Sequence, residues 1–66
     1  MKICDFTRKE LDFFREQANF TPDELAFFNL RAKDMSLIAV SMNMNISESK
    51  ADVLSRKVKR KILKVL

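Results

Sequence analysis

The sequence predicts an all-α fold, and three observations lead to this expectation. Apolar residues recur three and four positions apart, as on one face of an α-helix, and the period-two alternation of strands is missing. The chain has no Gly, one Pro and no Asn-Gly or Asp-Gly pair, so β-hairpins are not expected. Its 66 residues, 47% of them hydrophobic and six of them Phe, favour one small packed domain over disorder. We expect a single domain over residues 1–66 with helices at about 8–18, 22–33, 37–43 and 47–65.

Residues 6–11 and 20–25 carry the same helix-start signal. In each, a Phe precedes a Thr N-cap, a Glu three residues after the Thr completes a capping box, and a Leu can pack on the Phe as a hydrophobic staple. Pro22 occupies the first helical position, where its missing N–H costs nothing. Asn19, a residue tolerated in a left-handed cap, is expected just after the first helix. Either an ancient duplication or two helices with the same requirement explains the repeat, and we adopt the second interpretation.

The second and third helices are expected to supply much of the core. The residues predicted by spacing to face inward are Leu25, Phe28 and Ala32, with Phe27 and Leu30 beside them, and then Val40, Met44 and Ile46. Ser36 is the expected N-cap of the third helix, and Ser41 is expected where two helices cross closely. Asn43 and Asn45 suit the following turn, because Asn accepts positive φ better than most residues.

The last helix, which Ser47 is expected to cap, has two faces of opposite character. An apolar stripe is formed by Ala51, Leu54, Val58, Ile62 and Val65, and the other side carries Ser49, Lys50, Val53, Arg56, Lys57, Arg60 and Lys64. Residues 1–46 hold six Lys or Arg and seven Asp or Glu, a net charge of −1. Residues 47–66 hold seven Lys or Arg and two Asp or Glu, a net charge of +5. The basic excess therefore lies in this helix, which makes it the candidate for meeting a polyanion; a merely solvated Lys-rich face is the simpler alternative.

The composition argues against catalysis and against a bound metal or cofactor. There is no His to serve as a base or ligand, and a single Cys, Cys4, cannot form an internal disulfide. A Gly-rich phosphate loop cannot form without Gly. The chain shows no signal-like segment and no apolar run of membrane-spanning length. We therefore expect a cytoplasmic protein that is not an enzyme and has no cofactor.

A longer pattern runs from Phe20 to the basic run at residues 56–61. It comprises Phe20-Thr21-Pro22-Asp23-Glu24, Leu30, Ser36, Val40-Ser41 and Ile46-Ser47-Glu48. This pattern resembles the DNA-binding domain of bacterial LuxR-type regulators, and residues 30–66 are equally similar to region four of bacterial sigma factors. The additional helix before Phe20 fits the sigma-like version better. The resemblance implies a helix-turn-helix whose last helix enters the major groove, and the order of short helix, tight turn and basic helix independently suggests the same motif.

The DNA-binding residues expected in the last helix are Ser47, Ser49, Lys50, Val53, Arg56, Lys57, Arg60 and Lys64. The resemblance implies that Ser49, Lys50, Val53 and Arg56 face the groove and that Lys57 and Arg60 lie near the DNA backbone. The chain departs from the family pattern at Asp34 (usually Gly), Ser41 (usually Ala), Ala51 (usually the larger Val) and Asp52 (commonly Lys).

We expect a small transcriptional regulator whose partner is double-stranded DNA. The alternative is a protein-interaction module that docks on RNA polymerase or another regulator; Leu37 and Ile38 would supply its surface unless they belong to the core. A basic amphipathic helix lying on an anionic membrane is a third interpretation. It is disfavoured because the apolar stripe is needed to cover the other helices. The expected state is a monomer or a weak homodimer, the latter paired through Leu63 and Leu66 with Leu37 and Ile38.

Overall fold

Four α-helices and one short 3-10 helix make up the computed structural model, which describes residues 2–66. The elements are η1 (Ile3–Asp5), α1 (Arg8–Gln17), α2 (Pro22–Ala32), α3 (Leu37–Met44) and α4 (Glu48–Val65). No strand occurs among the described residues. The all-α expectation is therefore confirmed, and each predicted helix is found with its ends within one residue of the expected positions.

The one-residue differences at the helix ends have local causes. Ala18 and Lys33, expected inside the first two helices, are their C-caps. Ser47 has extended φ and ψ of −71° and 158°, so it stands outside α4 as the N-cap. Met44 remains helical because the chain leaves α3 only at Asn45, which takes a left-handed conformation with φ of 57°.

Both capping boxes form as predicted. The Thr7 N–H donates to Glu10 Oε1 at 2.8 Å, and the Glu10 N–H donates back to Thr7 Oγ1 at 3.2 Å. The corresponding distances between Thr21 and Glu24 are 2.9 and 3.3 Å. Each box satisfies backbone donors that the first turn of a helix leaves without an intrahelical partner, which explains why α1 and α2 begin where they do.

Three non-Gly residues with positive φ separate the helices. They are Asn19, Asp34 and Asn45, with φ of 54°, 63° and 57°. Asn and Asp tolerate this region better than other residues with a Cβ, so a chain without Gly still makes its sharp turns. The φ of Asp34 lies in a region that Gly enters at lower cost than a residue with a Cβ.

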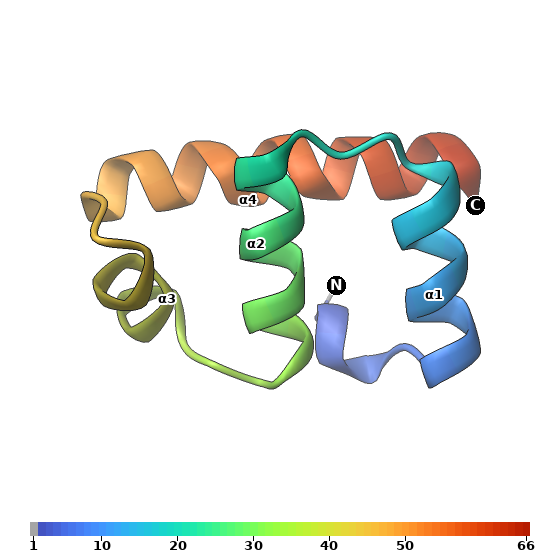
Figure 1. The fold of residues 1–66 in the computed structure, drawn as a ribbon, viewed down its shortest axis with the longest axis horizontal. Coiled ribbons are helices and arrows are strands. Elements are labelled where there is room, and N and C mark those ends of the chain that lie inside the picture. The colour runs from blue at the N-terminus through green and yellow to red at the C-terminus, as the bar shows by residue number, and fades with distance from the viewer. Residues whose placement is uncertain (1) are drawn as a thin grey trace.

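The long helix α4 lies across the other helices (Figure 1). α1 and α2 run antiparallel, α4 crosses both near the connection between them, and α3 packs under the N-terminal end of α4. The core that they enclose contains Phe14, Phe27, Phe28, Val40, Val58 and Ile62, each almost fully buried. The short η1, which the sequence did not predict, packs against α2 and buries Ile3.

Candidate nucleic-acid interface

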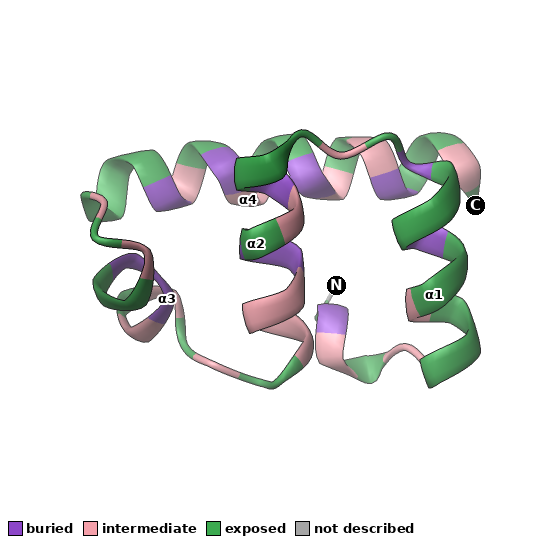
Figure 2. Cartoon of the chain, viewed as in Figure 1, coloured by how far each residue is buried: buried purple, intermediate pink, exposed green. Residues whose placement is uncertain are grey.

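The apolar stripe of α4 is buried, as predicted. Ala51, Leu54, Val58 and Ile62 belong to the core, and Val65 is half-buried against it. In Figure 2 these buried residues recur at regular intervals along α4, with exposed residues between them. Because the helix uses this stripe to cover α1, α2 and α3, the rotation of α4 about its axis is determined by packing, and the opposite face points away from the core.

Every residue proposed from the sequence to bind DNA is exposed. Ser47 lies just before α4 as its N-cap, and the face of α4 opposite the core carries Ser49, Lys50, Val53, Arg56, Lys57, Arg60 and Lys64. Lys50 and Lys64 are separated by about 21 Å along the helix axis, at a rise of about 1.5 Å per residue. The structure thus places the proposed residues on one accessible surface along nearly the whole of α4, which we call the basic face.

The positive charge of the basic face is largely free of intramolecular partners. Arg56 pairs with Asp52 at 2.9 Å, in the (i, i+4) arrangement of neighbouring helix turns, and both side chains are well exposed. Such exposed pairs contribute little to stability, so Arg56 can leave Asp52 for another anion at small cost. Within residues 2–66 no acidic side chain lies within ion-pair distance of Lys50, Lys57, Arg60 or Lys64.

Lys61 belongs to the same basic run but is used inside the molecule. Its Nζ donates to the backbone carbonyl of Asn19 at 3.0 Å and to Glu24 Oε1, and it forms an ion pair with that carboxylate. Glu24 is only 3% exposed. Burial alone would raise the pKa of Glu24, but the hydrogen bonds from Lys61 and Thr21 and the charge of Lys61 outweigh it, and the pKa is lowered.

Sequence reasoning missed this pair. The sequence pattern identifies Glu24 only as the N3 residue of a capping box, and a carboxylate in that role needs no further partner. Nothing in the local pattern distinguishes it from Glu10, the same position in α1, which remains exposed. The distinction comes from α4, which brings Lys61 to the start of α2.

The connection between α3 and α4 is short and well ordered by hydrogen bonds. Asn45 turns the chain, the Ile46 N–H donates to the Ser41 carbonyl at 2.9 Å, and Ser47 Oγ accepts from the Lys50 N–H at 3.1 Å. Ser41 is buried, and its hydroxyl donates to the Ile38 carbonyl at 2.7 Å. Three residues, 45–47, therefore separate α3 from α4.

Exposed apolar residues lie on two other surfaces. On α3, Ile38 is 56% and Met42 75% exposed, whereas Leu37 packs against the core. Of the two residues proposed as an interaction surface, Ile38 is exposed and Leu37 is half-buried. Met42, one turn further along α3, was missed, although the (i, i+4) spacing from Ile38 was visible in the sequence.

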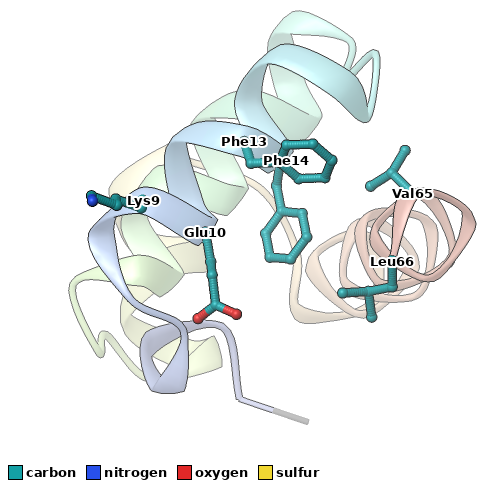
Figure 3. A pocket seen from close by; sticks show the side chains of 6 residues that line it. All are labelled: Lys9, Glu10, Phe13, Phe14, Val65 and Leu66. Carbon is teal, nitrogen blue, oxygen red and sulfur yellow. The ribbon is translucent and has the colours of Figure 1, made fainter.

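The second apolar surface lies where α1 approaches the end of α4. Figure 3 shows Phe13 and Phe14 of α1 and, across from them, Val65 and Leu66, around a groove of about 420 Å³ that Lys9 and Glu10 also line. Phe13 and Leu66 are exposed, as is Leu63, one turn earlier on α4.

The part of the chain that the structure describes contains no cluster of metal-ligating side chains. Within residues 2–66 no three His, Cys, Asp or Glu side chains gather where they could hold a metal ion. The Cys4 thiol donates to Asp34 Oδ1 at 3.3 Å, and this hydrogen bond raises the pKa of Cys4, which disfavours the nucleophilic thiolate. None of the helices in this range has the length and apolar character that a membrane span requires.

Comparison of the chain with models of protein families, with curated proteins and with solved structures gave no match.

Proposed function

We propose that this protein is a sequence-specific DNA-binding protein and acts as a small transcriptional regulator, of the helix-turn-helix type that sigma region four and LuxR-type domains share. In this proposal α3, residues 45–47 and α4 form the helix-turn-helix, and α4 enters the major groove of double-stranded DNA. The three-residue connection between the helices supports this motif, which typically has a turn of three or four residues.

The observation that carries the proposal is the exposed, largely unpaired basic face of α4. A row of Lys and Arg along one exposed helix face is the electrostatic footprint of a nucleic-acid-binding protein. An α-helix with side chains is about 10–12 Å across, and the major groove of B-DNA is about 12 Å wide. The face lies opposite the core, so α4 can enter a groove without losing any of the packing that holds the domain together.

The two halves of the basic face have different roles in this proposal. The N-terminal half, with Ser47, Ser49, Lys50 and Val53, carries mostly short side chains that let the helix approach base edges. The C-terminal half carries Lys57, Arg60 and Lys64, which reach the phosphates on the walls of the groove. Phosphate contacts supply affinity for any sequence, and contacts with base edges supply specificity.

The phosphate role is tested by the salt dependence of binding to random duplex DNA, measured by gel shift. Each phosphate contact adds about 0.9 to the slope of log K against log salt concentration. Arg60→Ala is expected to weaken binding to all sequences and to reduce the slope by about one. The double variant that carries Arg60→Ala and Lys57→Ala is expected to reduce the slope by about two. Lys33→Ala is the matched control, because Lys33 is exposed at the end of α2 remote from α4 and should leave the slope unchanged. An unchanged slope in the double variant would contradict the proposal.

A protein-interaction module is the second candidate function, and Ile38 and Met42 favour it. These exposed apolar side chains lie on α3, within a stretch from Met35 to Ser47 that carries no charged residue. A surface of this kind suits an apolar partner site on RNA polymerase or another regulator better than it suits DNA. Two results together would favour this function over the first. The protein would co-purify with RNA polymerase and lose this association in Met42→Glu, and it would show no salt-dependent binding to duplex DNA.

A further inference from the structure

Val53 is an apolar residue within the basic face. Its side chain is 46% exposed, and the residues one helical turn away on either side are Ser49, Lys50, Arg56 and Lys57, all exposed. A rotation of about 100° per residue puts Arg56 about 60° to one side of Val53, with Lys57 about 40° and Lys50 about 60° to the other. Val53 therefore lies in the middle of this surface, between long basic side chains.

Val is a poor choice for an exposed helix position if stability alone matters. A β-branched side chain loses rotamer freedom in a helix, so Val has a lower helix propensity than Ala, Lys or Glu. Val53 recovers none of this cost by burial in the core, since the core stripe of α4 lies on the other side of the helix. The same stiffness holds its two methyl groups in one orientation, so little freedom is lost when they contact a partner.

The lengths of the surrounding side chains determine what Val53 can reach. Basic side chains on both flanks extend well beyond the Val methyls, so a phosphate on either side can be contacted while Val53 faces the space between. When α4 lies in the major groove, that space contains the edges of the base pairs. Of the four bases, only thymine presents an apolar group there, its C5 methyl, and apolar side chains are its usual partners.

We propose that Val53 is a specificity-determining residue that contacts the C5 methyl group of thymine in the major groove. The inference rests on the proposed function, because it requires α4 to enter the groove of duplex DNA. Lys57 and Arg60 hold the helix against the phosphates, and Lys50 and Arg56 face the groove beside Val53. The Val53 methyls exclude water from the thymine methyl. A cytosine or purine at the same position offers polar groups that Val53 cannot satisfy.

Uracil substitution tests this contact, because uracil differs from thymine only by the missing methyl. A duplex selected from random DNA by the unaltered protein is prepared with each thymine replaced in turn by uracil. One replacement is expected to lower the affinity about fourfold, the factor that corresponds to burial of one methyl-sized group. Val53→Ala is expected to bind the thymine duplex as weakly as the unaltered protein binds the uracil duplex, and to show no difference between the two.

Two controls make the experiment decisive. Val53→Ala should fold normally, because the site is exposed and Ala favours helix, and circular dichroism checks this. Leu63→Ala removes an exposed apolar side chain from the same helix and should keep the thymine preference. A thymine preference that survives in Val53→Ala overturns the inference. The inference is also overturned if the unaltered protein does not distinguish thymine from uracil but binds more tightly when a cytosine is replaced by 5-methylcytosine. The methyl group contacted would then belong to 5-methylcytosine and not to thymine.

The result also separates this inference from the proposed function. If the unaltered protein binds duplex DNA with a steep salt dependence but does not distinguish thymine from uracil, the proposed function stands and the role of Val53 is wrong. If it shows no salt-dependent binding at all, the proposed function itself fails.

Discussion

One carboxylate oxygen of Glu24 accepts two hydrogen bonds. Its Oε1 accepts from the Thr21 N–H, which starts α2, and from Lys61 Nζ, which lies 37 residues away on α4. Lys61 also donates to the Asn19 carbonyl, at the turn before α2. A capping residue thus joins the start of α2 to the long helix that carries the basic face. With Lys61 engaged in this way, we expect Lys61 to contribute less to DNA affinity than Lys57 or Arg60.

The charge of Glu24 can be tested separately from its capping role. Gln also completes a capping box, so Glu24→Gln should retain the helix start but leave Lys61 without its ion pair. We expect a loss of about 1–3 kcal/mol in the free energy of unfolding at pH 7, measured with urea. Glu10→Gln is the matched control, because Glu10 has the same role in α1 but is exposed, and its effect should stay within about 0.5 kcal/mol.

The pair also predicts a pH dependence. The pKa of Glu24 is lowered from its ordinary value of 4.5 by folding, so its contribution to stability is complete above that value and is lost as the pH falls through the folded-state pKa. The stability difference between the unaltered protein and Glu24→Gln should therefore shrink below about pH 4.5. A difference that stays constant from pH 7 to pH 3 would show that the charge of Glu24 contributes nothing.

At the scale of the element, α4 carries two sets of residues on opposite faces of the helix. The buried stripe joins it to α1, α2 and α3, and the exposed side carries the basic face. The two sets of residues do not overlap, so substitutions on one side should leave the function of the other intact. This division separates the residues that hold the fold together from those proposed to bind DNA.

Two Leu residues on α4 test the division. Leu54 is 6% exposed and Leu63 is 63% exposed, so the same substitution should have different effects. Leu54→Ala should lower the free energy of unfolding by about 2–5 kcal/mol, through lost burial and the cavity that remains. Leu63→Ala should change it by no more than about 0.5 kcal/mol. Thermal melting compares the two, and a Leu54→Ala variant that melts like the unaltered protein would show that the stripe does not hold the core.

At the scale of the whole molecule, the exposed apolar residues outside the basic face are divided between its two ends. Ile38 and Met42 lie on α3, under the N-terminal end of α4, whereas Leu63 and Leu66 lie toward the C-terminus at the other end (Figure 1). A symmetric contact was expected from Leu37, Ile38, Leu63 and Leu66. These residues do not form one continuous surface, and Leu37 is packed against the core.

We therefore predict a monomer in dilute solution, with pairing only on DNA or at high concentration. Two half-sites one helical turn apart would raise the effective concentration of the second copy without any new contact. Sedimentation at micromolar concentration should show a single species with the mass of one chain, 7.7 kDa. A stable dimer at that concentration would contradict the prediction, and Leu63→Glu would then show whether the end of α4 holds it together.

The sequence by itself determined the number and order of the four α-helices, and their limits to within one residue, because the signals involved are local. A capping box acts within four residues, an Asn with positive φ acts on its own backbone, and an apolar stripe repeats within one helix. These signals also predicted which side of α4 is buried. What only the tertiary structure decided depends on residues far apart in the chain. The ion pair between Glu24 and Lys61, the difference between Leu37 and Ile38, and the separation of the apolar patches all follow from how α4 crosses the other helices. That crossing is set by the fit of many side chains at once, and no single stretch of sequence contains it.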